Sequence, residues 1–430
     1  MPITNQLVSR IVEQAQSRVE GANFDVRKHL LEYDDVLNTQ REKIYAQRDR
    51  ILTKDDLSED VTGMLREEIQ RRVPEALNDE EGPWKLLSWL EQIQPSIPLT
   101  TGIFPSYTLK LLCDSLGPAQ HSPEATQPAL LDLARRAIQA EEAHLLHTVD
   151  ELLESNQISM QTLIDERLEL LDIFIDGLGL EDETDTRSPQ QLAQELAEML
   201  RIPVQIAPDL ARQLRDNPDA VSDQLYKAVQ EVIQALTITR LIGAVERVLK
   251  DSLGVSPNDL SGKTWDQLAE QIMDAIQKIY RERLSTYIGD EASPGLIARD
   301  LQTNLARYTG GQLTEKDLLG LILAMPQGRR QAFDKKTHKR IWQGTTRLTY
   351  IHAAAGELEH RSPEEITSAV LAHLEGAQAA IRAEWGQSEI SRLGEATLTE
   401  LSPESRSGVM QRLGAESFTA VEAQPISSIA

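Results

Sequence analysis

The 430-residue sequence has little cysteine, few aromatic side chains and no long apolar runs. Its single cysteine, Cys113, excludes an internal disulfide and a cysteine-rich zinc site, and it fits a reducing cytoplasm. No stretch of about 18 apolar residues is present to span a bilayer, and the N-terminus lacks the apolar core of a signal peptide. We therefore expect a cytoplasmic chain whose contact with a membrane would be peripheral.

Positive charge is also scarce, because 44 Lys and Arg stand against 68 Asp and Glu, a formal net charge of −24. Such a balance argues against a general nucleic-acid binder, whose phosphate contacts need clustered Lys and Arg. Aromatic residues make up only 4%, whereas Leu, Ala, Gln, Glu and Arg dominate, which favours helices over sheets. We expect an all-α protein of about two to four domains.

The first part of the sequence predicts one very long helix. From Leu7 to Ile51 apolar side chains recur in steps of three, four or seven, which keeps one face of an α-helix apolar. No proline follows Pro2 until Pro74, and at about 1.5 Å per residue the periodic segment would span roughly 65 Å. We expect an elongated scaffold built on residues 1–73, whose helical pattern persists until Pro74 ends it.

Other side chains of this helix indicate several neighbours. A second apolar set, Leu31, Tyr45 and Leu52, lies roughly 120° around the cylinder from the first. Asp34 and Asp35 have no Lys or Arg three or four positions away, so the usual ion pairs of a helix surface are missing. Either both carboxylates are simply solvated, or they bind the cations of a partner.

The same stretch resembles a known family in a long, nearly continuous match of mixed residue types. The residues that carry it include Asn23-Phe24-Asp25-Val26-Arg27-Lys28, Leu30-Leu31-Glu32-Tyr33-Asp34-Asp35-Val36 and Gln40-Arg41-Glu42. They resemble the start of the helical scaffold domain of SecA, the motor ATPase of bacterial preprotein translocation. The resemblance covers residues 1–55, weakens toward Gly179 and is absent beyond it.

The resemblance implies partners for the long helix. In that family the helix docks against both nucleotide-binding domains, which hold ATP and Mg²⁺, and against the preprotein-crosslinking domain. The expected partners are SecA-type motor domains in cis or in trans, a SecY-type channel and the preprotein, and no cofactor is expected on this chain itself. The side chains expected at the interface are Phe24, Arg27, Tyr33, Asp34, Asp35, Arg41 and Tyr45.

The rest of the sequence predicts helical segments of different character. Residues 74–128 are a proline-interrupted, loop-rich module that corresponds by position to the family's wing domain. Residues 129–180 predict a helical hairpin that turns at Ser155-Asn156, although the Trp and His signature of the family's two-helix finger is absent. Residues 189–387 predict a further helical region, and residues 388–430 predict a flexible tail with disordered final residues.

Proline and cap residues place helix starts in that further region, as at Ser256-Pro257 and Ser362-Pro363. The expected helices lie near Pro189–Leu200, Pro208–Arg215, Ala220–Leu253, Thr264–Ile288, Gly295–Tyr308, Leu313–Met325, Lys339–Glu359 and Pro363–Trp385.

Two stretches resemble binding sites, one for phosphate and one for a metal, and each also has a purely structural interpretation. Ser261-Gly262-Lys263-Thr264 ends like a phosphate-binding loop, but Pro257 stands where that loop needs a glycine, which favours helix capping by Thr264. His144 and His147 could hold a metal from one helix face, yet only one Glu-x-x-His copy is present, which favours ordinary surface histidines. No serine or cysteine lies in a recognisable nucleophile motif, so we expect no catalytic residue.

One electrostatic feature stands out in this acidic sequence. Between Gln327 and Arg347 seven Lys and Arg stand against Asp334 alone, a local charge of +6, and Phe333 and Trp342 are interleaved with them. The acidic hairpin could pair with these cations inside the molecule. Alternatively they face anionic lipid head groups, a ribosome, a channel loop or an acidic substrate segment. The residues of this basic patch are Arg329, Arg330, Lys335, Lys336, Lys339 and Arg340.

Together these features predict the scaffold and wing part of a SecA-like motor that supports preprotein export across the bacterial plasma membrane. The matched segment begins abruptly at Met1, so we expect a truncated or separately encoded piece whose ATPase domains are supplied elsewhere. It would be cytoplasmic, and could be peripheral on the inner face of the membrane. The alternative is a standalone helical adaptor that uses the same helix for a different binding role. An independent hydrolase has almost no support.

Overall fold

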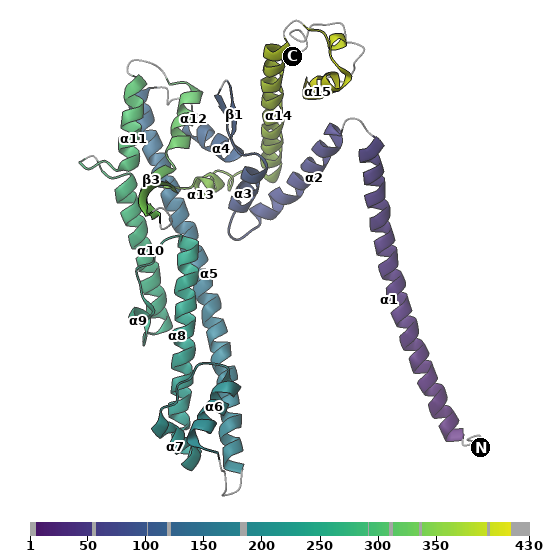
Figure 1. The fold of residues 1–430 in the computed structure, drawn as a ribbon, viewed down its shortest axis with the longest axis vertical. Helices are drawn as coiled ribbons and strands as arrows, with labels where there is room; N and C mark the ends of the chain where they lie inside the picture. Colours follow the sequence, from purple (N-terminus) through teal and green to yellow (C-terminus); the bar gives the residue numbers. More distant parts are fainter. Residues whose placement is uncertain are drawn as a thin grey trace. The chain divides into compact units, whose positions relative to one another are not determined.

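The structure, a computed structural model, describes residues 6–53, 57–100, 102–117, 122–180, 187–290, 292–308, 313–334, 338–393 and 396–413 (Figure 1). Most of this part of the chain is helical, and its strands form only two antiparallel pairs, which confirms the all-α prediction in its main point. The chain divides into two compact units, Met1–Arg71 and Arg72–Ala430. No helix in the described ranges is both long enough and apolar enough to cross a membrane.

The first unit is built on helix α1 (Gln6–Thr53) and most of helix α2 (Ser58–Leu77). The 48 residues of α1 confirm the predicted long helix. Helix α2 corrects the expectation that Pro74 ends it, because the helix continues for a further turn. A proline lacks an N–H group, but its carbonyl can still accept, and here it accepts from the Asn78 N–H at 3.1 Å. The proline therefore weakens the last turn without ending the helix before it.

The second unit begins with a small module, at the position where the wing is expected. It contains α3 (Trp84–Ile93), β1 (Ile97–Leu99), β2 (Gly102–Phe104) and α4 (Tyr107–Leu116). The two strands pair antiparallel, and the leucines on the inner faces of α3 and α4 are fully or almost fully buried. Ser106 caps α4, since its Oγ accepts from the Leu109 N–H and donates to a Glu91 oxygen at 2.5 Å.

Helix α5 (Pro123–Leu180) is continuous over 58 residues, so the helical hairpin predicted for residues 129–180 is wrong. Ser155-Asn156 indicated a turn because such side chains compete for backbone hydrogen bonds. In the structure the Asn156 amide instead donates to the Leu152 carbonyl at 2.7 Å, one turn back along the same helix. No glycine or proline lies near this point before Gly177, so the backbone has no reason to stop.

Helices α8 (Ser222–Leu249) and α10 (Trp265–Tyr287) pack along α5 (Figure 1). The predicted cap of α10 is confirmed, because the Thr264 hydroxyl accepts from the Gln267 N–H and the Gln267 side chain accepts from the Thr264 N–H. The Lys263 ammonium group donates a hydrogen bond to the side chain of Gln271, which lies on α10. The stretch that ended like a phosphate-binding loop is thus the start of a helix.

Two short helices, α6 (Pro189–Leu200) and α7 (Pro208–Asp216), complete a core around the last part of α5. Leu171 of α5, Leu196 of α6 and Leu225 of α8 belong to this buried cluster. The cluster joins segments that polar linkers separate in the sequence. Helices α6, α7 and α8 therefore form one core with α5.

The remaining elements lie in the second unit as well. They are the 3-10 turns Pro218–Val221, Ala306–Tyr308 and Leu398–Glu400, and helices α9 (Pro257–Leu260), α11 (Leu296–Leu305), α12 (Glu315–Ala324), α13 (Ile351–Gly356), α14 (Pro363–Leu393) and α15 (Pro403–Leu413).

Two of these helices correct the flexible tail expected for residues 388–430. Helix α14 runs past Trp385 to Leu393, and α15 follows it. The Ser402 hydroxyl accepts from the Ser405 N–H at the start of α15, a cap that the sequence analysis did not use. The final residues, 414–430, lie outside the described residues.

A β-hairpin replaces part of the helix predicted for Lys339–Glu359. Strands β3 (Gln327–Asp334) and β4 (Lys339–Thr346) pair antiparallel over their full length, and only α13 is helical in the predicted range. The β-branched and aromatic residues of β4, among them Ile341 and Trp342, favour a pleated strand over a helix.

Candidate functional site

Within its own unit, the apolar stripe of α1 is not covered. Val26, Leu30 and Ile44 expose 59%, 59% and 61% of their surface, and at about 100° per residue they lie within roughly 40° of one another. We call this the α1 stripe; its members are Val19, Val26, Leu30, Tyr33, Leu37, Ile44 and Ile51. Leu37 alone among them is half-buried. Covering one large apolar side chain contributes about 1.5–3 kcal/mol, so a row left uncovered indicates a docking face.

Charged side chains follow one edge of the α1 stripe. Arg27, Asp34 and Arg41 stand at intervals of seven residues, which an α-helix places on nearly one line. Arg41 donates to the Asn38 side chain at 3.2 Å. Neither Asp34 nor Asp35 makes an ion pair within the described part of the chain. The edge therefore presents alternating charges, positive, negative and positive, to whatever covers the stripe.

The other predicted interface residues are exposed too, but they do not all share this side. Phe24, at 67% exposure, and Asp35 lie about 120° or more from the α1 stripe, beside Leu31. Tyr33 belongs to the stripe, and Tyr45 lies near the charged edge, with Arg48 over its ring at 5.0 Å. The predicted site is thus two faces of one helix, as expected for a helix with more than one neighbour.

Four of the six basic-patch residues lie on the β3–β4 hairpin, namely Arg329, Arg330, Lys339 and Arg340, and all four are exposed. Lys335 and Lys336 lie outside the described residues. Intramolecular pairing is not seen for the four: within the described residues none forms an ion pair. Only the nearby Arg347 does so, with Asp300 at 2.5 Å.

The two histidines considered for a metal, His144 and His147, line the same pocket but have different partners. His144 stacks on His352, with ring centroids 4.1 Å apart, beside Trp84 in a pocket of about 440 Å³. Burial lowers the pKa of His352 to about 4, which keeps its imidazole neutral. His147 instead pairs with Glu151 at 3.6 Å. In the part of the chain that the structure describes, no three His, Cys, Asp or Glu side chains gather as metal ligands.

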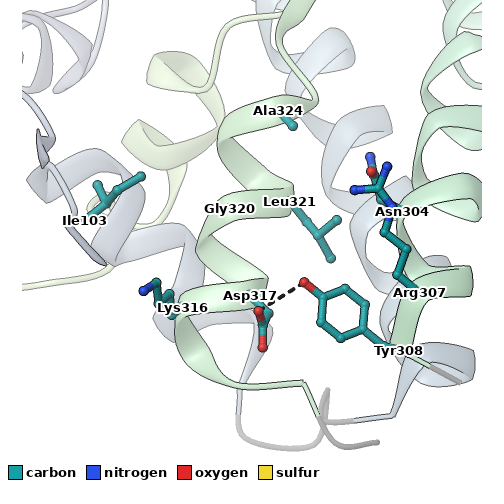
Figure 2. Close-up of a pocket in the computed structure, with 9 residues that line it drawn as sticks. All are labelled: Ile103, Asn304, Arg307, Tyr308, Lys316, Asp317, Gly320, Leu321 and Ala324. Atoms are coloured by element: carbon teal, nitrogen blue, oxygen red, sulfur yellow. Dashed lines mark hydrogen bonds between the residues drawn. The ribbon is translucent and has the colours of Figure 1, made fainter. Parts of the chain in front are cut away.

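A second pocket, of about 320 Å³, lies between α11, α12 and β2. Figure 2 shows the Tyr308 hydroxyl directed at Asp317, to which it donates at 3.0 Å. The other Asp317 oxygen accepts from the Thr314 hydroxyl and N–H, and these bonds hold the pKa of that carboxyl below its ordinary value. The carboxylate in this pocket therefore works as a helix cap.

Comparison with known proteins places the α1 stripe in a named family region. Residues 2–169 match the family model described as the SecA Wing and Scaffold domain. The chain is 52% identical over 87 residues to the protein translocase subunit SecA of Syntrophus aciditrophicus, which covers 20% of this chain and 10% of that protein. It is 35% identical over 192 residues to the SecA subunit of Pelotomaculum thermopropionicum, or 42% of this chain and 20% of that one.

A third relative, the SecA subunit of Dehalococcoides mccartyi strain CBDB1, is 62% identical over 68 residues, or 16% of this chain and 7% of that protein. The chain thus spans no more than about a fifth of the length of the relatives described here. No solved structure matches the chain.

Proposed function

We propose that the chain, whose residues 2–169 are a SecA-type wing and scaffold region, supplies the scaffold and wing of a SecA-like protein translocation motor. One observation carries this proposal: the α1 stripe is exposed along the segment that matches the family. A long helix that keeps an apolar row in water gains most by docking on a partner's apolar surface. The proposed partner is a set of SecA-type motor domains, in cis or in trans, which would hold ATP and Mg²⁺.

The charged edge of the α1 stripe indicates which charges the partner's surface should carry. Arg27, Asp34 and Arg41 alternate in sign along one line, so the covering surface should present an acid, a base and an acid in the same order. Opposite charges in this register fix orientation and suppress wrong partners more than they add affinity. Asp34 would then meet a cation of the motor domains.

The remaining partners follow from the same proposal. A SecY-type channel and a preprotein would be met on the cytoplasmic side, at the inner face of the plasma membrane. Direct pushing of the substrate by a two-helix finger is not included, because α5 is one continuous helix where a hairpin was expected. The chain itself is proposed to bind no nucleotide, which calorimetry with ATP on the purified chain would test.

A second candidate function is a standalone helical adaptor. It is favoured by the extent of the match, since residues 170–430 lie outside the family model, and helices α6, α7 and α8 in that range share a core with α5. In that case the α1 stripe would bind a protein without a motor role. The two candidates differ in whether SecA-type motor domains bind the stripe.

The test is binding of the full chain to the SecA subunit of Syntrophus aciditrophicus from which its own wing and scaffold region has been deleted. Leu30→Ser changes the α1 stripe, whereas Leu31→Ser makes the same change one residue along, about 100° around the helix. Both side chains are exposed, at 59% and 64%, so neither variant should alter melting.

We expect Leu30→Ser to weaken binding by about tenfold, because roughly 1.4 kcal/mol of apolar burial is lost, and Leu31→Ser by much less. Absence of binding by the unchanged chain would favour the adaptor. Equal losses in the two variants would assign docking to both apolar faces of α1 and not to the stripe in particular.

A further inference from the structure

The β3–β4 hairpin sorts the basic patch into two different faces. In an antiparallel pair, directly opposed residues share a face and the faces alternate along each strand. Phe333 opposes Arg340, Gln331 opposes Trp342, and Arg329 opposes Gly344. One face, which we call the aromatic face, therefore carries Arg329, Phe333, Arg340 and Trp342.

The opposite face has a lower net charge, because it also carries an acid, and a different apolar content. Arg330 opposes Gln343, Ala332 opposes Ile341, and Asp334 opposes Lys339. This aliphatic face therefore carries Arg330, Ala332, Asp334, Lys339 and Ile341. Two cations lie on each face, but an acid offsets one of them on the aliphatic face, and only the aromatic face carries two large rings.

Both rings of the aromatic face stand in water. Trp342 exposes 66% of its surface and Phe333 exposes 60%. The Phe333 and His338 rings lie in an edge-to-face arrangement with their centroids 6.1 Å apart. Trp342 lies diagonally across the strands from both Phe333 and Arg329, within reach of long side chains. The face thus alternates cations and rings and is not covered by the rest of its unit.

The cations of this face are available to an external anion. Within the described residues neither Arg329 nor Arg340 forms an ion pair. On the other face, Arg330 donates to its cross-strand neighbour Gln343 at 3.4 Å. The sequence adds Lys335 and Lys336 between the strands. Positive charge gathered here, in a chain of net charge −24, selects a negatively charged surface by complementarity.

We infer that the aromatic face of the β3–β4 hairpin lies flat on an anionic lipid surface. Trp342 and Phe333 would sit at the level of the head groups, where amphipathic and aromatic rings are favoured. Arg329 and Arg340 would reach the lipid phosphates, with their stems along the apolar boundary. The docking does not depend on the α1 stripe, which belongs to the other unit.

A single-stranded nucleic acid is the competing occupant, because rings and guanidinium groups also stack on bases. The lipid surface is favoured by the shape of the site. Rings and cations lie together on one face of a ribbon only two strands wide, which suits contact with an extended surface. A nucleic acid is usually held in a positively charged groove that follows its backbone.

The test is flotation of the full chain with vesicles that contain phosphatidylglycerol and with vesicles of phosphatidylcholine alone. The variant R329Q/R340Q removes two charges from the aromatic face, and its matched control R330Q/K339Q removes two from the aliphatic face. Trp342→Ser and Ile341→Ser form a second matched pair. All these side chains are exposed, so melting temperatures report separately whether the hairpin still folds.

We expect binding only to the phosphatidylglycerol vesicles. R329Q/R340Q should weaken it about thirtyfold, as two contacts near an anionic surface imply, and the matched control should weaken it by about threefold. Trp342→Ser should lower partitioning more than Ile341→Ser does.

Three outcomes would overturn the inference. They are no flotation of the unchanged chain, equal losses in the two double variants, and displacement from the vesicles by a single-stranded RNA oligonucleotide. A fall in melting temperature with R329Q/R340Q alone would assign these cations to the fold instead. Motor-domain binding by the same variants should stay unchanged, which separates this surface from the α1 stripe.

Discussion

Helices α1 and α10 carry the same kind of apolar periodicity and differ in what covers it. Ile272 and Ile276 of α10 are fully buried, whereas Leu30 and Ile44 of α1 expose about 60% of their surface. Helix α10 packs on α5 and α11 within its own unit. Periodicity therefore predicts a helix and its apolar face, but it does not say whether the helix's own unit covers that face.

The contacts that α1 makes within its unit explain the difference. Its C-terminal end meets α2, where Arg50 pairs with Asp60 at 3.3 Å and the Gln47 amide lies 3.8 Å from the Met64 sulfur. These are polar or edge contacts near one end of a 48-residue helix. The central part of the α1 stripe depends on something outside its unit, and this contrast with α10 can be tested by mutation.

The largest effect is expected from truncating a buried residue of α10. Ile276→Ala should lower the free energy of unfolding by about 2–5 kcal/mol, because it removes apolar burial and leaves a cavity. The matched change Ile44→Ala, at 61% exposure, should stay within about 0.5 kcal/mol. Urea titration followed by circular dichroism measures both. Similar losses would mean that the α1 stripe is packed in the free chain.

A smaller effect should follow from acidification of the second unit. His373 is buried, and its Nε2 lies 2.7 Å from the Gln94 Oε1. Burial lowers the pKa of this imidazole to about 4, below its ordinary value of 6.5. The unfolded chain therefore binds a proton first as pH falls below about 6.5, and stability is lost toward pH 4, by up to about 3 kcal/mol.

His373→Gln should flatten this pH dependence, while His147→Gln, on an exposed side chain paired with Glu151, should not. Melting temperatures measured between pH 7 and pH 4 compare the two. Equal slopes for the His373→Gln variant and the unchanged chain would contradict the assignment.

The smallest effect is expected at the cap of α10. Thr264→Ala removes the hydroxyl that accepts from the Gln267 N–H, which should cost about 1 kcal/mol. Thr264→Ser keeps the acceptor and should be close to neutral. Thermal unfolding distinguishes them, and an equal loss in both variants would show that the methyl group and not the cap matters.

The sequence predicted the elements whose ends carry local signals. Helix α6 and the start of α10 follow from Ser188-Pro189 and Thr264, because caps and first-turn prolines act within a few residues. The sequence wrongly predicted a turn at Asn156, because a polar side chain that favours turns can also donate a hydrogen bond back into its own helix. Local sequence signals therefore predicted the starts of helices better than they predicted the turns between them.

The candidate sites were predicted as sets of residues and not as surfaces. The basic patch was recognised from its charge, but its division into two faces depends on the register of β3 and β4. The β-branched and aromatic pair Ile341-Trp342 was the signal that could have indicated a strand there. The buried contact of Gln94 with His373 joins residues 279 positions apart, which no local pattern encodes.

The most direct measurement of the central claim is amide hydrogen exchange across α1 and α10 in the full chain, with and without SecA-type motor domains. Alone, amides near Leu30 and Ile44 should exchange much faster than those near Ile276, because few buried contacts oppose local opening. On binding, protection of α1 should rise by at least about tenfold, with α10 unchanged. Protection of α1 equal to that of α10 in the free chain, or unchanged by a partner that binds, would contradict the claim.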